Sequence, residues 1–448
     1  MSRNMMKRIL SLLLALTLLL GNVPAVVFAT EDMTEPVVET ETVATEEVTV
    51  PAETELPTQP ETVPEETVAP TQEKESADMI ISDEAMLASG QVASGTCGSN
   101  LTWTLDDKNT LTISGSGSTY GYRESNLRDY CAPWFDYRTS IETIVIESGV
   151  TNLGAYVFYR CTAATKVTIP DSVTNISQGA FRDCWSLTDI TIPNSVTNMD
   201  SYAFEGCSNL VSIALSENLT AIADYAFRDC ISLTEITIPN GVTSIGYEAF
   251  NKCASLCSIT LSDSITSIDM FAFSNCGGLA EVHISNLENW CKINFNDNTA
   301  NPLYAAERLY LNGSLVTDVV IPNGTDTINT YAFYGYTGLN NVTVPNSVIS
   351  IGDWAFSGCK NLSTVSIAEG LTGFGAGVFS GCSSLASVSL PDSLACIGDS
   401  TFSGCSSLAS VSLPDSLSSI GNSTFSGCSS LASVSLPDSL TDIGGSAF

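Results

Sequence analysis

The residues of this 448-residue chain that could do chemistry are one histidine, fifteen cysteines and many carboxylates. Nucleophilic catalysis needs a nucleophile beside a base, and the only histidine is His283. It stands between Val282 and Ile284 in an alternating pattern, which points it outward from a strand. No Gly-x-Ser-x-Gly motif is present. The sequence therefore predicts no nucleophilic hydrolase site.

Metal and cofactor signatures are also missing from the sequence. Cys253 and Cys257 are four residues apart, but no second pair of zinc ligands accompanies them. There is no phosphate loop, dinucleotide fingerprint or calcium-loop spacing. A glycoside hydrolase site made of two carboxylates is an open alternative, because carboxylates are abundant. No two of them, however, form a motif that indicates such a site. We expect a protein that is not an enzyme and that has no cofactor and no metal site.

Ten of the fifteen cysteines share one position in a repeat. Each follows a phenylalanine by three residues, and the phenylalanines recur every 23 residues with a single interval of 60. The phenylalanines are Phe158, Phe181, Phe204, Phe227, Phe250, Phe273, Phe333, Phe356, Phe379, Phe402, Phe425 and Phe448. A fixed period in the twenties is typical of a solenoid, because no single coil can bury its own apolar face.

A cysteine at a fixed repeat position is a small buried apolar group that stacks on its equivalents, so we predict reduced, buried thiols in this column. The column comprises Cys161, Cys184, Cys207, Cys230, Cys253, Cys276, Cys359, Cys382, Cys405 and Cys428. Five cysteines lie outside it, and disulfides among them stay open: Cys97, Cys131, Cys257, Cys291 and Cys396.

One coil, LTDITIPNSVTNMDSYAFEGC over residues 187–207, shows what must position these residues. Its first part alternates, with Ile190 inward and Thr191 outward, so it predicts an extended strand that stacks in parallel on its equivalents. Pro193 ends that strand. The spacing of Ala203, Phe204 and Cys207 predicts a short helical turn that closes the coil. Some twelve such coils would extend roughly 60 Å at the usual strand spacing.

The outward strand positions form a long face of small, mostly hydroxylated side chains. One reading is an ordinary solvated sheet surface; the other is a broad, shallow docking surface for a protein or glycan. The candidate positions are Thr168, Thr191, Thr237, Thr260, His283, Thr343, Ser366, Ser389, Ser412 and Ser435.

The long interval between Phe273 and Phe333 contains an insertion at about 285–320. Four aromatic residues concentrate there: Trp290, Phe295, Tyr304 and Tyr310. Aromatic residues are favoured as interface anchors, so these four are candidates for contacting a partner. They are equally what a local core needs where the repeat is interrupted.

The N-terminus predicts export. Arg3, Lys7 and Arg8 precede a 12-residue apolar run, Ile9 to Leu20, and a small-residue cleavage site. We therefore interpret residues 1–29 as a signal peptide; a retained anchor is the alternative, although 12 residues are too few to span a bilayer. Residues 30–90 form a Glu-, Thr- and Pro-rich stretch that we expect to be a disordered spacer.

The charge excludes some partners. The formal net charge of the chain is −33, of which residues 79–448 carry −22, from 12 basic and 34 acidic residues. Nucleic acid and anionic membrane surfaces are therefore not expected as partners. No later segment is apolar for long enough to be a transmembrane helix.

The recurring pattern L-x-x-[IV]-x-[IVL]-P-x-[SG]-V-x-x-I-G-x-x-A-F-x-x-C resembles that of the BspA-like leucine-rich repeat family of surface proteins. Two further stretches carry the resemblance: residues 95–134, which read as a hairpin unit, and residues 290–322, which match a recurring insertion. The resemblance implies a β-rich α/β, right-handed leucine-rich repeat solenoid with a parallel sheet on one face. It covers about residues 92–448 and places a β capping unit at 91–140 and the solenoid at 141–448.

For function, the resemblance implies a secreted or cell-surface protein that works by adhesion, binding host extracellular-matrix proteins, glycans or other cells. The alternative is an accessory module of a longer secreted enzyme. Residues 381–403, 404–426 and 427–448 are near-copies, and the chain stops inside a coil at Phe448. We expect it to be part of a longer gene product, because a solenoid end needs a cap.

Overall fold

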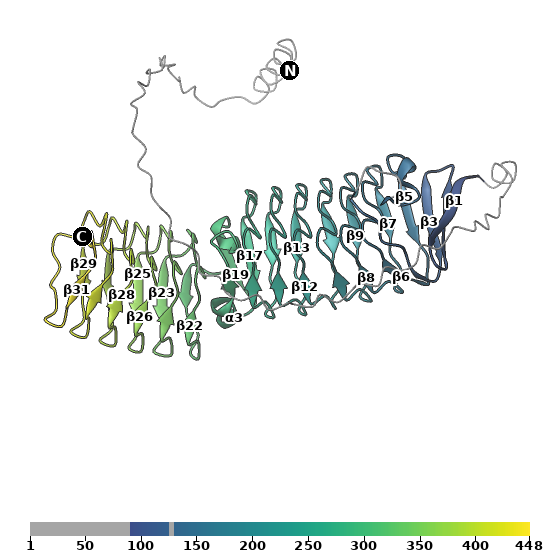
Figure 1. Cartoon of the computed structure of the whole chain (residues 1–448). Helices are drawn as coiled ribbons and strands as arrows, with labels where there is room; N and C mark the ends of the chain where they lie inside the picture. Colours follow the sequence, from purple (N-terminus) through teal and green to yellow (C-terminus); the bar gives the residue numbers. More distant parts are fainter. Residues whose placement is uncertain (1–89, 125–129) are drawn as a thin grey trace, which may run out of the picture. The chain divides into compact units, whose positions relative to one another are not determined.

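The computed structural model describes residues 90–124 and 130–448, which belong to one compact unit, Asp78–Phe448. The predicted signal peptide and all but the last residue of the predicted spacer lie outside the described residues. Within the unit, the chain winds through successive coils, and equivalent strands of neighbouring coils lie side by side (Figure 1). The predicted leucine-rich repeat solenoid is confirmed.

The first ladder of strands, here the long-strand ladder, uses the segment in which inward and outward residues alternate. Its partners are parallel and mostly 23 residues apart, as where Ile236 lies opposite Ile259, and 27 apart at the insertion, where Glu281 lies opposite Arg308. Its strands are β5 (Thr143–Ile146), β7 (Lys166–Thr168), β9 (Asp189–Thr191), β11 (Ser212–Ala214), β13 (Glu235–Thr237), β15 (Ser258–Thr260), β17 (Glu281–Ile284), β19 (Arg308–Leu311), β21 (Asp318–Val320), β23 (Asn341–Val344), β25 (Thr364–Ile367), β27 (Ser387–Ser389) and β29 (Ser410–Ser412).

A second ladder, the short-strand ladder, follows the turn after each long strand, and the sequence analysis did not foresee it as a sheet. Most of its strands have two residues, of which the second is buried, as in Ser244–Ile245. They are β4 (Gly117–Ser118), β6 (Val150–Leu153), β8 (Asn175–Ile176), β10 (Asn198–Met199), β12 (Ala221–Ile222), β14 (Ser244–Ile245), β16 (Ser267–Ile268), β18 (Asn294–Phe295), β22 (Thr327–Ile328), β24 (Ser350–Ile351), β26 (Gly373–Phe374), β28 (Cys396–Ile397), β30 (Ser419–Ile420) and β31 (Asp442–Ile443).

An antiparallel hairpin precedes the first coil. Strands β2 (Leu101–Asp106) and β3 (Thr110–Gly115) pair with Trp103 opposite Ile113, as their alternation predicts. Strand β1 (Gln91–Gly98) pairs with β2 on the other side, and β3 pairs in parallel with β5. The hairpin therefore covers the strand edge that the first coil would otherwise leave open.

The segment that carries the phenylalanine is a series of turns rather than the helical turn expected from its spacing. Two positions of each coil, two residues before and two residues after the phenylalanine, have left-handed backbone, as at Tyr202 (φ 63°) and Gly206 (φ 73°). A left-handed residue cannot continue a right-handed helix. The N–H groups instead reach the next coil, where Phe204 donates to Ala226 at 2.9 Å and Gly206 to Arg228 at 2.8 Å.

The phenylalanines form a stacked column through the core. Neighbouring rings are nearly parallel, with centroids 5.2 Å apart for Phe181 and Phe204 and 5.4 Å apart for Phe227 and Phe250. The column runs from Phe158 to Phe273 and resumes from Phe333 after the insertion. Each ring therefore fills the space between its two neighbours.

The repeat cysteines form a second buried column. From Cys184 onward, each thiol lies near the carbonyl of a phenylalanine 26 residues earlier, as where Cys207 Sγ donates to Phe181 O at 3.2 Å. All ten are free, buried thiols. Burial raises the pKa of Cys161 and of Cys276 to about 12, so both thiols stay protonated at neutral pH.

This arrangement predicts the outcome of thiol labelling. In the native protein only the two exposed cysteines, Cys257 and Cys396, should react with a thiol reagent at pH 8. The remaining cysteines should react only after denaturation. Thiol titration before and after denaturation measures both values, and a native protein whose column cysteines are mostly oxidised would contradict the buried-thiol column.

Candidate functional site

The candidate docking surface, here the hydroxyl face, is the outward side of the long-strand ladder. Seven of its predicted positions lie exposed on strands: Thr168, Thr191, Thr237, Thr343, Ser366, Ser389 and Ser412. Thr260 and His283 are half-buried. Ser435 is exposed, but residues 433–435 do not form the strand that the repeat predicts. The expectation that Ser435 lies on a strand is therefore wrong.

The strand register brings these positions together in rows rather than scattering them. Thr260 lies between Thr237 and His283, which are its parallel partners on either side. In later coils Thr343 lies opposite Ser366, and Ser389 opposite Ser412. The rows are interrupted, because the long-strand ladder is divided into four hydrogen-bonded sheets. The face thus consists of several short blocks of aligned side chains.

The chemical character of the hydroxyl face changes along the chain. The earlier coils add outward carboxylates, Asp189, Glu235 and Glu281. The later coils present almost only serine, and a shallow hollow there is lined by Ser387, Ser389, Ser410, Ser412 and Ser435 with Val388, Val411 and Leu413. Hydroxyl groups donate and accept hydrogen bonds in changeable directions. Such a surface makes many weak contacts and has no dominant one.

One cluster joins the hydroxyl face to the insertion. His283 on β17 stacks on Tyr310 of β19, with ring centroids 4.7 Å apart and planes 8° from parallel. Glu281 lies 3.3 Å from His283 Nε2 and 3.2 Å from the guanidinium of Arg308. His283 lies on the outward side of the strand, as its alternation predicts, and is held there in a network.

The insertion places its aromatic residues in two different environments. Helix α3 (Leu287–Lys292) begins at Asn286, whose side chain accepts hydrogen bonds from two backbone N–H groups. Trp290 is 1% exposed and donates from Nε1 to Ala332 O at 2.9 Å, and Phe295 is 2% exposed. Neither is available to a partner, so for these two residues the structure supports the alternative reading, a local core, and not an interface anchor. Tyr304, on the 3-10 helix Pro302–Tyr304, is 50% exposed.

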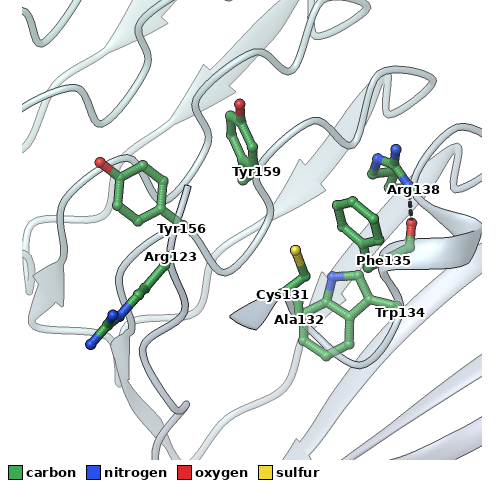
Figure 2. A pocket seen from close by; sticks show the side chains of 8 residues that line it. All are labelled: Arg123, Cys131, Ala132, Trp134, Phe135, Arg138, Tyr156 and Tyr159. Carbon is green, nitrogen blue, oxygen red and sulfur yellow. Dashed lines mark hydrogen bonds between the residues drawn. The ribbon is translucent and has the colours of Figure 1, made fainter. Parts of the chain in front are cut away.

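A small cavity near the hairpin contains a cysteine beside an arginine. Figure 2 shows Cys131 and Trp134 at its wall, with Arg138 bonded to Phe135 O. A catalytic thiol needs a lowered pKa. Burial raises the pKa of Cys131, and nearby Arg138 only partly opposes this. The only histidine is not among the residues that line the cavity. The cavity therefore does not supply an activated nucleophile.

A surface that the sequence analysis missed follows the left-handed turns. Tyr202 and Tyr225 stack with centroids 4.6 Å apart, and Arg182 and Arg228 lie over their rings. Glu205 is buried and lies 2.6 Å from Arg182 Nε. The signal was the repeated Tyr-Ala-Phe triplet, in which the tyrosine always takes the left-handed position. These contacts run from coil to coil and stabilise the stack.

Within residues 90–124 and 130–448 no group of three or more His, Cys, Asp or Glu side chains is placed to hold a metal ion. In the same ranges no helix has the length and apolar character needed to cross a bilayer.

Comparison with known proteins gives a family match. The model of the BspA type leucine rich repeat region matches in six copies, over residues 130–253, 220–301, 307–411 and 361–448. No curated protein matches the chain.

Several solved structures are similar. A leucine-rich repeat protein from Eubacterium ventriosum is 24% identical, with 80% of this chain and 95% of that chain covered and a TM-score of 0.45. A leucine rich cell surface protein from Faecalibacterium prausnitzii is 28% identical, with 80% and 96% covered and a TM-score of 0.42. A leucine-rich repeat protein from Bacteroides ovatus is 20% identical, with 78% and 98% covered and a TM-score of 0.47.

Proposed function

Because the chain belongs to the BspA-type leucine-rich repeat family, we propose that it is an exported, cell-surface scaffold that mediates adhesion through protein–protein contacts and has no catalytic activity. The hydroxyl face is the proposed binding surface. Its partners are an extracellular or host-matrix protein, a glycan or another cell. The observation that carries the proposal is the alignment of small, exposed side chains in register on successive coils.

Three features support this proposal. The N-terminal sequence is typical of a secretory signal, which would place the repeats outside the cytoplasm. The described cysteine column is reduced and buried, so the repeats do not depend on disulfides for their stability. A long face of weak contacts suits binding that is strengthened by display of many copies on one surface.

The insertion supplies a secondary candidate contact. Of its four aromatic residues, Tyr304 is at the surface and Tyr310 is partly exposed beside His283. Because they occur once while the hydroxyl face continues through many coils, we assign most of the binding to the face.

Adhesion of coated beads tests the proposal. Beads carrying residues 90–448 are passed over layers of fibronectin, collagen, laminin or bacterial cells, and the retained fraction is counted. The test variant replaces Thr191, Thr237 and Thr343 with Glu. These side chains are exposed, so the fold should persist while the added bulk and charge block close contact. We expect retention to fall at least tenfold.

The matched control carries the same substitution beside the other ladder, at Thr243, Thr266 and Thr372, which are also exposed and each immediately precede one of its strands. It should retain wild-type adhesion. Failure of the wild-type beads to adhere to every layer, or equal losses in both variants, would overturn the proposed use of the hydroxyl face.

A further inference from the structure

The short-strand ladder opens between β10 and β12, where no insertion interrupts the coils; its other break, between β18 and β22, lies at the insertion. In the coils on either side, equivalent residues are joined by backbone bonds: Thr197 N–H donates to Thr174 O at 3.0 Å, and Thr243 N–H to Thr220 O at 2.9 Å. The corresponding bond from Thr220 to Thr197 is missing, and β10 ends one sheet while β12 begins the next. The opening leaves backbone donors and acceptors without the partners they have elsewhere.

A hollow of about 350 Å³ lies over this opening and is open to solvent. This size is within the range of small-molecule sites. It is lined by Gln178, Thr197, Asn198, Met199, Asp200, Ser201, Tyr202, Thr220, Ala221 and Ala223. Two alanines, Ala221 and Ala223, stand where the preceding coil has Asn198 and Asp200. The two small side chains leave room for the hollow at this coil.

The edge of the hollow is an interrupted row of asparagines. Asn175 donates from its amide to Asn152 Oδ1, and Asn198 donates to Asn175 Oδ1 at 2.7 Å. Asn198 also donates to Asp200 Oδ1 at 2.7 Å. Both bonds come from Nδ2, so they fix the orientation of the Asn198 amide. The next residue of the row would bond to Asn198 Oδ1, but Ala221 has no polar group.

We propose that this hollow is a binding site for a neutral saccharide. The amide oxygen of Asn198, the second carboxylate oxygen of Asp200 and the carbonyls of β10 are acceptors, while the Thr220 N–H and the Gln178 amide are donors. Sugar hydroxyls both donate and accept, so a polyhydroxylated ring matches this mixture. The orientation of Asn198 before binding lowers the ordering cost of the complex.

The charge of the lining and the length of the strands favour a neutral saccharide over an anionic ligand or an extended peptide. Asp200 is the only charged residue of the lining, and the chain is strongly acidic, so an anionic ligand is repelled. An extended peptide that added to the sheet would find strands of only two residues, Asn198–Met199 and Ala221–Ile222. The site is on the short-strand ladder and is therefore independent of the hydroxyl face.

Affinity electrophoresis of residues 90–448 in gels that contain galactomannan, laminarin or glycogen tests the proposal, with heparin as the polyanion. At least one neutral polysaccharide should retard the wild-type protein, and heparin should not. Ala221→Asn continues the asparagine row into the hollow and leaves every other lining group in place. We expect it to weaken the retardation at least tenfold, and Asn198→Ala to do the same.

Ser267→Asn is the matched control, because it places an asparagine at the same repeat position two coils away, and it should bind as the wild type does. Circular dichroism melting verifies that the variants fold. Absence of retardation in all three neutral gels would overturn the proposal. So would retardation that Ala221→Asn leaves unchanged, or retardation by heparin alone.

Discussion

Raising the pH from 8 to about 11 is expected to unfold the repeat unit cooperatively, because the buried cysteine column cannot ionise while it stays folded. Unfolded cysteine ionises with a pKa near 8.5. Burial raises the pKa of Cys161, Cys276 and Cys405 to about 12. At a pH between these two pKa values, the unfolded chain releases thiol protons that the folded chain retains. The free energy of unfolding therefore falls as the pH rises, by about 1.4 kcal/mol per pH unit for each such thiol.

The size of the effect comes from the repetition. A single buried thiol would lower the free energy of unfolding only modestly. The column has ten such thiols, and the free energy of unfolding of a typical domain is only about 5–15 kcal/mol. Thiolate absorbance at 240 nm and far-ultraviolet circular dichroism are recorded together during the titration. The titration uses Cys257→Ala combined with Cys396→Ala, so that only buried cysteines supply thiolate, and the absorbance of tyrosinate is subtracted. Both signals should then change in one transition. Thiolate absorbance that rises at pH 9–10 while the circular dichroism stays native would contradict the buried column.

A variant provides the matched control for this titration. Cys230→Ala combined with Cys253→Ala removes two adjacent ionisable groups from the middle of the column. It should lose stability at pH 7, because small cavities are created. Its further loss between pH 7 and pH 10 should nevertheless be smaller than that of the wild type.

Phe250→Ala is expected to have the largest effect among single substitutions of a middle coil, a loss of about 3–5 kcal/mol in the free energy of unfolding. The ring is fully buried and lies between Phe227 and Phe273, 5.4 Å from the centroid of each. Its removal opens a cavity that both neighbouring coils share. Urea unfolding followed by circular dichroism measures the change.

Asp189→Ala is the control for Phe250→Ala, because Asp189 is exposed at the outward side of β9. It should change the stability by less than about 0.5 kcal/mol. Equal losses in the two variants would show that the inward and outward sides of the coil are assigned wrongly.

The period of the sequence was sufficient to predict the core but not the backbone that surrounds it. Phe204 and Cys207 lie in columns because every coil repeats their positions, and Ile190 points inward because the strand alternates. The left-handed conformation of Tyr202 was not predicted, because tyrosine is not a usual residue at positive φ. It is enforced by hydrogen bonds to the next coil, which no single coil reveals.

The contacts of the insertion could not be predicted from the sequence either. Trp290 is buried because its N–H reaches Ala332, 42 residues later, and such a contact has no local signature. Tyr336 takes the place of a repeat cysteine because its longer side chain bridges the interrupted coils: it accepts from Leu309 N at 3.3 Å and donates to Val316 O. The two alanines of the saccharide hollow were visible in the sequence, but the opening of the ladder beneath them depends on how two coils meet.

Site-specific photo-crosslinking tests whether the hydroxyl face is the binding surface. A photoreactive phenylalanine is placed singly at Thr237 and Thr343 on the face, at Tyr304 in the insertion and at Thr243 beside the other ladder, all of them exposed. Each protein is irradiated on the layer that retains wild-type beads. We expect crosslinked partner from Thr237 and Thr343, with little from Thr243. Crosslinks from Tyr304 or Thr243 alone would contradict it.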